Sequence, residues 1–294
     1  MFDYRYHALS LAAVLFALAL GVLIGVAIGD SNLVSSAKDG IVHKLNVEVG
    51  DANERISDLR GSLTDEQAFA KGLYPLAVRE LLSGHDVGLV FLGNSSDEVN
   101  SLVRSAVTAG GGSLVTVAAV REPLDLEAID EAAAGTHYAT LAESVPLVEH
   151  FGELVGRQLV SGGQAVNQEL INRVRGPLMS ALDGPFTRLQ GVVVMRAEPT
   201  EMEPEQSEAA AAFESGLLAG IAAVGVPAVG VELSNATESQ IPWYKGKHIS
   251  SVDDVDEQAG QASLIYALAG YSGTFGIKGT ADSLLPALTG ATQP

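Results

Sequence analysis

The hydrophobic pattern of the chain begins with one long apolar stretch. From Ala8 to Ile28 no residue is charged and only Ser10 is polar. At about 1.5 Å per residue, a helix of this length covers the roughly 30 Å of a bilayer core. Residues 1–29 therefore predict an N-terminal tail and a transmembrane helix. A cleavable signal peptide is the main alternative, because Gly25 and Ala27 are small enough for a cleavage site, and a buried core helix is the second.

Small residues recur every fourth position within this stretch. They are Ala13, Ala17, Gly21, Gly25 and Gly29. Such a stripe allows two helix backbones to approach closely in lipid, so it predicts self-association of the transmembrane helix. The alternative is that glycine and alanine are simply common in membrane helices.

A seven-residue repeat follows in residues 30–73. Apolar side chains occupy its a and d positions, which include Val42, Leu45, Val49, Ala52, Ile56, Leu59 and Leu63. This pattern is typical of a coiled coil, so we predict a stalk that pairs two chains as a homodimer. We expect a short coil with a break near Gly61, because glycine weakens a helix interior. A lone amphipathic helix that folds back on the rest of the chain is the alternative.

Residues 74–294 alternate between strand-length apolar runs and amphipathic helices. The expected strands cover residues 86–93, 113–120, 189–195, 227–233 and 249–252, and the segment of about 123–182 reads as a helical insertion. The clearest helix runs from about Glu98 to Gly110, and the residues from Asn94 to Asp97 are expected to cap it. Asp253 to Asp256 are expected to cap the last helix. The pattern predicts an α/β domain with a Rossmann-like, mostly parallel five-stranded sheet and helices on both faces.

Composition narrows the classes of partner. The formal net charge is −19 and there is no cysteine. The negative charge argues against binding to nucleic acid, and the absence of cysteine excludes disulfides, thiolate metal sites and a cysteine nucleophile. A seven-residue N-terminal tail before the span and a long acidic domain after it favour a single-pass cell-membrane protein with a cytoplasmic N-terminus and an extracytoplasmic domain.

The α/β part carries no recognisable catalytic motif. A ligand of such a fold would lie at the carboxyl ends of the strands, which here means residues 93–97, 196–198 and 234–238. No glycine-rich dinucleotide fingerprint, P-loop or nucleophile elbow is present, and the six histidines are dispersed. We therefore predict no catalytic residues, no evident cofactor and no enzymatic activity, and the sequence names no metal ligands.

The opening of the chain and its C-terminal region resemble a known family. The opening FDYRYHALSLAAVLFALALGVLIG and the C-terminal SSVDDVDEQAGQASLIYALAG and GTFGIKGTADSLLP are similar to the actinobacterial MctB family. The resemblance implies one N-terminal span, a coiled-coil stalk and an extracytoplasmic α/β domain, with outer-envelope placement as an alternative to the cell membrane.

The same resemblance implies two possible roles. One is copper transport or copper homeostasis, and copper enters as a ligand only on this ground. The other is that of the SteB-like members, which act with a SteA-like partner to regulate a peptidoglycan hydrolase in cell separation. Nothing in the residues favours a pore, because one span cannot enclose a channel unless many copies assemble.

Overall fold

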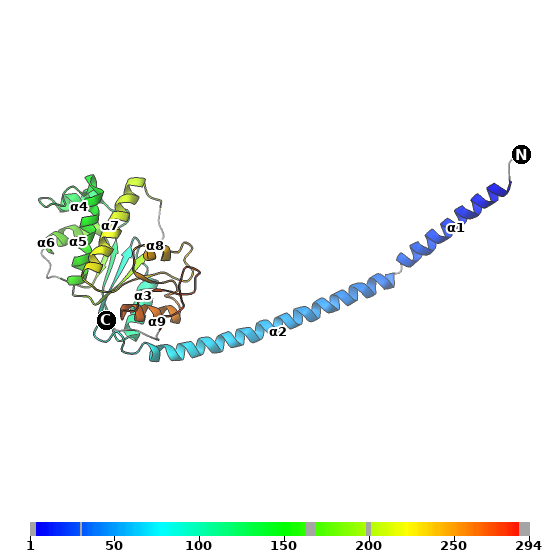
Figure 1. The fold of residues 1–294 in the computed structure, drawn as a ribbon, viewed down its shortest axis with the longest axis horizontal. Helices are drawn as coiled ribbons and strands as arrows, with labels where there is room; N and C mark the ends of the chain where they lie inside the picture. The colour runs from blue at the N-terminus through cyan, green and yellow to red at the C-terminus, as the bar shows by residue number, and fades with distance from the viewer. Residues whose placement is uncertain (1–3, 30, 163–167, 198–200, 288–294) are drawn as a thin grey trace. The chain divides into compact units, whose positions relative to one another are not determined.

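A computed structural model describes residues 4–29, 31–162, 168–197 and 201–287. The chain divides into two compact units, residues 1–67 and 68–294. Figure 1 traces the chain from the N-terminal helices to the α/β part.

The N-terminal unit is helical. Helix α1 spans Tyr4–Ile28, and residues Tyr4–Ala27 are long and apolar enough to cross a membrane. Helix α2 spans Ser31–Ala77. The expected break near Gly61 is wrong, because α2 continues through it. Four glycines spread over 47 residues each cost only about 1 kcal/mol, which the intervening helix formers can offset.

The sheet contains seven strands within the described residues, so the expectation of five was wrong. They are β1 (Asp86–Leu92), β2 (Ser113–Val120), β3 (Met179–Asp183), β4 (Gly191–Arg196), β5 (Ala228–Val231), β6 (Ser250–Val252) and β7 (Thr274–Phe275). Their order is β3-β2-β1-β4-β5-β6-β7, and every pairing is parallel except that of β2 with β3. The two unexpected strands form the two ends of this order.

Helices cover both faces of the sheet, as the sequence predicted. On one face lie α4 (Leu126–Ala132), α5 (Val145–Ser161), α6 (Gln168–Leu178) and α7 (Pro204–Ala223), and on the other lie α3 (Asp97–Ala109) and α9 (Gln258–Leu268) (Figure 1). A 3₁₀ turn (Leu141–Glu143) precedes α5, and the short helix α8 (Ile241–Gly246) follows β5.

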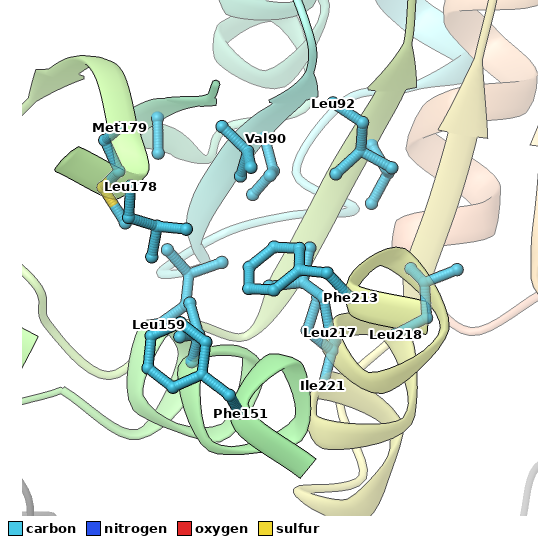
Figure 2. Packing of buried hydrophobic residues seen from close by; sticks show 14 of the residues in the cluster. Val90, Leu92, Phe151, Leu159, Leu178, Met179, Phe213, Leu217, Leu218 and Ile221 are labelled. Carbon is cyan, nitrogen blue, oxygen red and sulfur yellow. The ribbon is translucent and has the colours of Figure 1, made fainter. Parts of the chain in front are cut away.

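The side chains of strand β1 are buried on both faces of the sheet. Leu89 and Phe91 belong to the core beneath α3 and α9, whereas Val90 and Leu92 belong to the core beneath α5 and α7. Figure 2 shows Val90 and Leu92 facing aromatic and aliphatic side chains of those two helices, such as Phe213. A strand buried on both faces has a continuous apolar sequence, and this is the signal that located β1.

Helices α5 and α7 cross at glycines. An added Cβ at Gly156 would lie 2.1 Å from the Leu217 carbonyl oxygen, and one at Gly216 would lie 1.9 Å from that of Glu149. Gly152 and Gly220 are equally tight against the opposite helix. The two backbones are therefore in direct contact, with no side chain between them.

The end of α2 belongs to the second unit. Tyr266 Oη on α9 donates a hydrogen bond to the Ala77 carbonyl oxygen at 2.9 Å, and Val78 and Leu82 just beyond α2 are fully buried. Within the last turns of α2, Tyr74 is partly buried against the hydrophobic core beneath α3 and α9.

Helix N-termini were predicted with mixed success. Ser96 Oγ accepts a hydrogen bond from the Val99 amide and caps α3, as expected. The cap expected for α9 is wrong, because Glu257 occupies its N-cap position and makes no side-chain cap bond. Asp253 and Asp256, which precede it, accept hydrogen bonds from other groups.

Candidate functional site at the carboxyl edge of the sheet

Arg196 is the centre of a polar network at the carboxyl end of β4. Its Nε donates to Glu214 Oε1 at 2.7 Å and its Nη1 donates to Gln240 Oε1 at 2.6 Å. The guanidinium carbon lies 5.0 Å from the centre of the Trp243 ring, and Lys247 Nζ lies 5.7 Å from the same centre. One strand end therefore joins α7 to α8 through charge-assisted and cation–π contacts.

Glu122 and Glu214 form a carboxyl pair beside Arg196. Glu214 is 1% exposed, and its Oε2 accepts no hydrogen bond from an N–H or hydroxyl group of the described residues. Burial, followed by the charge of Glu214, raises the pKa of Glu122 from 4.5 to about 7. Burial also raises the pKa of Glu214, against the opposing effect of Arg196. Because Arg196 bonds Glu214 directly, we assign the proton to Glu122, which then donates a hydrogen bond to Glu214.

A second network lies at the end of β5. Glu232, 3% exposed, accepts hydrogen bonds from Lys278 Nζ at 2.7 Å, Ser239 Oγ at 2.8 Å and the Gln240 amide at 2.6 Å. Gln240 therefore links Glu232 to Arg196, since its side-chain oxygen accepts from the guanidinium. The charges of this network are paired, as burial requires.

Tyr244 places α8 beneath both networks. Its hydroxyl accepts from the Arg196 amide at 2.8 Å and lies 3.2 Å from the carbonyl oxygens of Val194 and Val231. Its ring packs on Gly230 of β5, where an added Cβ would lie 2.4 Å from ring carbons. Tyr244 thus bridges the ends of two neighbouring strands, and Gly230 leaves room for its ring.

Of the three aspartates before α9, two accept hydrogen bonds and one does not. Asp253 accepts from the Ile277 and Lys278 amides at 2.8 and 3.1 Å, and Asp256 accepts from Ser234 N and Oγ at 2.7 and 2.6 Å. Asp254 is fully buried and neither of its carboxyl oxygens has a donor. Burial, followed by the charge of Asp253, raises the pKa of Asp254 from 3.8 to about 7.

Two clefts open at this edge. The larger, about 790 Å³, is lined among the described residues by six acids and one base, Arg121, together with apolar side chains of the β2–α4 connection, α5 and α7. We call it the acidic cleft; its acids are Glu122, Asp125, Glu127, Glu143, Glu205 and Glu208. The smaller, about 250 Å³, lies between the ends of β4 and β5 and includes Arg196. Glu122 lines one cleft and Arg196 the other, so the network connects them.

The structure brings together two of the three segments expected at the ligand edge. Arg196 and residues of 234–238 line the smaller cleft, as expected. Gly93 lies close to this site, with Glu122 Oε2 3.2 Å from the position of an added Cβ, whereas Ser96 serves as a helix cap. Glu198 lies outside the described residues.

The residues expected to pair two chains stay as predictions. On α1, the described stripe positions Ala13, Ala17, Gly21 and Gly25 are exposed, as is Gly29 just beyond the helix. The seven seam residues of α2 are also exposed, with Val42, Leu45, Val49, Ile56, Leu59 and Leu63 between 45% and 69%.

No group of three His, Cys, Asp or Glu residues is close enough to hold a metal ion in the parts of the chain that the structure describes.

Sequence reasoning missed Glu122, Glu214, Gln240 and Lys278. Glu214 had a signal, since it lies among apolar residues on a helix whose other buried positions include Phe213 and Leu217. An acid at a buried helix position needs a partner, and Arg196, which ends the preceding apolar strand, would have been the candidate.

Comparison with known proteins gives one family. Residues 1–286 match the family described as copper transport outer membrane protein, MctB. Similar proteins include copper transporter MctB of Mycobacterium bovis and that of Mycobacterium tuberculosis. Each is 24% identical over 290 residues, which cover 91% of this chain and 92% of the relative. The chain therefore belongs to the MctB family of copper transport outer membrane proteins, the family that its opening and C-terminal motifs resemble.

Proposed function

We propose that this chain is a membrane-anchored cell-envelope protein that serves copper transport or copper homeostasis without catalysing a reaction. The observation that carries the proposal is the match of residues 1–286 to a family of copper transport outer membrane proteins. Helix α1 supports the membrane attachment, because residues 4–27 are long and apolar enough to span a bilayer.

The proposed topology puts the short N-terminal tail in the cytoplasm and the α/β domain outside it. The domain is acidic and carries most of a net charge of −19, which favours a solvated location over contact with anionic lipid headgroups. The family description supports an envelope location, and fractionation of inner and outer membranes would assign the bilayer that α1 occupies.

Copper is the cargo in this proposal, and the family match, not a resident copper centre, supports it. Cysteine is absent from the sequence, and soft thiolate ligands are those that Cu(I) prefers. We therefore assign no copper ligand to numbered residues.

The test is cellular copper content. A host strain without the gene should show altered copper per cell and altered growth inhibition by copper, and the full chain should restore both. A chain without residues 8–28 should fail to restore them, and zinc serves as the control metal. Unchanged copper content and copper tolerance in the deletion strain would overturn the proposal.

A second candidate function is that of a SteB-like scaffold that controls a peptidoglycan hydrolase together with a SteA-like partner. The observation in its favour is α2, whose apolar seam residues are exposed within one chain and are arranged for pairing with a second copy. In such a dimer the two α2 helices would form one stalk. Partners on both sides of the membrane would depend on this stalk for their binding.

Purification of the tagged full chain from membranes separates the two functions. Bound copper and co-purifying proteins are measured on the same sample. Copper without a hydrolase or its regulator supports transport, whereas the hydrolase and its regulator without copper support the scaffold.

A further inference from the structure

The seam of α2, the stripe formed by its a and d positions, has one charged member. Nine of the ten seam positions from Val42 to Leu73 are apolar, and the tenth, a d position, is Glu66. Helix α2 is continuous over these residues (Figure 1), so no break shifts the seven-residue frame along the seam. Glu66 is exposed in one chain and lies on the same stripe as its apolar neighbours.

The surroundings of Glu66 on its own helix provide no cation for the carboxylate. Side chains three and four positions away are its neighbours on a helix surface. None of these four is charged; they are Ser62, Leu63, Phe69 and Ala70. Asp65 and Lys71 occupy the outer positions c and b, which face away from the seam, and Arg60 lies six residues away, about 9 Å along the helix axis. The charge of Glu66 is therefore balanced only by water.

Pairing of α2 with a second copy would bring this residue against itself. The inference rests on the pairing that the second candidate function proposes. Two copies that enter one bilayer through α1 have α2 helices that run in the same direction and start at the same level. In a parallel pair of this kind each d residue faces the same residue of the other copy, and the e residue beside it, Gln67, is neutral. Two Glu66 carboxyl groups would share one layer, between those of Leu63 and Ala70.

The charge state of these two groups decides what the layer contributes. Two carboxylates at close range repel one another, and both lose part of their hydration when the apolar layers on either side come together. A protonated carboxyl group has an O–H that donates a hydrogen bond to the facing carboxyl oxygen, and the repulsion is gone. Pairing therefore favours protonation of this layer, and by linkage a lower pH favours pairing.

We propose that protonation of Glu66 regulates the pairing of α2 with a second copy, so that the pair is tighter at acidic pH than at neutral pH. The apolar layers from Val42 to Leu63 hold the two copies together, and the layer of Glu66 sets how tightly the segment next to the α/β domain is joined. Acidification of the compartment that contains α2 is the signal to which this device responds.

The test uses the full chain in a non-ionic detergent at pH 5.5 and at pH 8. The chain has no cysteine, so Ser57→Cys, at an outer b position of α2, provides a single site for a spin label. Pulsed electron paramagnetic resonance over a dilution series gives the fraction of labels that lie at the short distance of a coiled coil, and from it the dissociation constant. This measurement reports the pairing of α2 itself, whether or not α1 also associates.

We expect the labelled chain to pair about tenfold more tightly at pH 5.5 than at pH 8. Glu66→Gln removes the charge and keeps the size of the side chain, so it should pair at pH 8 about as tightly as at pH 5.5. Glu54→Gln is the matched control, because Glu54 occupies an outer f position and its substitution changes the net charge by the same amount. This control should keep the full pH dependence.

Two results would overturn the role of Glu66 and leave the pairing of α2 intact. One is equal pairing of the labelled chain at the two pH values, and the other is a pH dependence that is as large in Glu66→Gln as in Glu54→Gln. A different result, no short distance at either pH in any of the three chains, would overturn the pairing of α2 itself and this proposal with it.

Discussion

Arg196 on β4 and Glu214 on α7 form an ion pair at 2.7 Å in which the carboxylate is 1% exposed and the guanidinium 17% exposed. Two side chains from adjacent layers of the domain, the sheet and the helices on one of its faces, thus neutralise one another at the carboxyl edge of the sheet. A pair of this kind costs little while both partners are present, and removing one partner is expensive because the other stays buried.

Arg196→Met should therefore destabilise the domain strongly. We expect a loss of about 3–5 kcal/mol in the free energy of unfolding, because Glu214 would remain buried without its positive partner. Urea unfolding followed by the fluorescence of Trp243 measures it. The control is Arg157→Met, since Arg157 pairs with Glu153 on the surface of α5 and is 52% exposed. A loss no larger than that of the control would contradict this account of the pair.

The glycine crossing predicts a second effect on stability. Gly216→Ala puts a methyl group 1.9 Å from the Glu149 carbonyl oxygen, so α5 and α7 must separate. We expect a loss of at least about 2 kcal/mol. Gly176→Ala on α6 is the matched control, because an added Cβ there has no neighbour within 4 Å. It should be neutral or slightly stabilising, since alanine favours a helix. Equal effects of the two substitutions would refute the backbone contact.

Two buried acids predict how stability depends on pH. Glu122 and Asp254 have ordinary pKa values of 4.5 and 3.8, and both are raised to about 7 in the folded protein. Between about pH 4 and pH 7 the folded chain retains protons that the unfolded chain has released. Raising the pH through this window therefore favours unfolding, and stability should fall until about pH 7 and then level off.

The measurement is the urea midpoint at pH 5, 6, 7 and 8. The double variant Glu122→Gln with Asp254→Asn should show a flatter profile and a higher midpoint at pH 8 than the unmodified chain. Glu169→Gln, exposed on α6, should keep the original slope. A slope that persists in the double variant would assign the pH dependence to other groups.

The proposed pairing of α2 depends on its seam. Ile56→Asp with Leu59→Asp places two charges at a and d positions, and we expect a monomer where the unmodified chain is a dimer, because a charge in a coiled-coil seam would lose its hydration. Sedimentation in density-matched detergent gives the oligomeric state. Asp58→Asn, between the two seam residues, is the control. A double variant that stays dimeric would show that α2 is not the pairing surface.

The long apolar runs made the sheet predictable in part. Strand β1 was expected at residues 86–93 and lies at Asp86–Leu92, and α3 was expected from Glu98 to Gly110 and lies at Asp97–Ala109. Both sides of β1 are buried, so its sequence is apolar at every position but Asp86. Helix α3 has a clear cap and a single buried face, which fixes its start and its period.

Strands β3 and β7 were not predicted because their sequences carry little strand signal. In β3, Ser180, Ala181 and Asp183 are exposed, so its only strong apolar anchors are Met179 and Leu182. Strand β7 has two residues, Thr274 and Phe275. Both lie at the ends of the sheet, where each is held by pairing with one neighbouring strand. The periodicity of a single sequence does not reveal such pairing.

The polar site was predictable only as a location. Parallel topology places strand ends together, and this reasoning correctly identified the end of β4 and residues 234–238. Glu122 and Glu214 reach the same point from a connection and from a helix on one face of the sheet. Their meeting depends on how the helices pack, which no spacing along the chain encodes.

The direct backbone contact of α5 and α7 also determines which parts of the domain are able to move. Two helices that touch through glycines have no side-chain layer to slide on, so they behave as one rigid block. The walls of the acidic cleft that carry Val145, Val148 and Ala209 belong to this block. The opposite wall is the connection from Glu122 to Glu127, and the hydrogen bond between Glu122 and Glu214 joins this connection to α7.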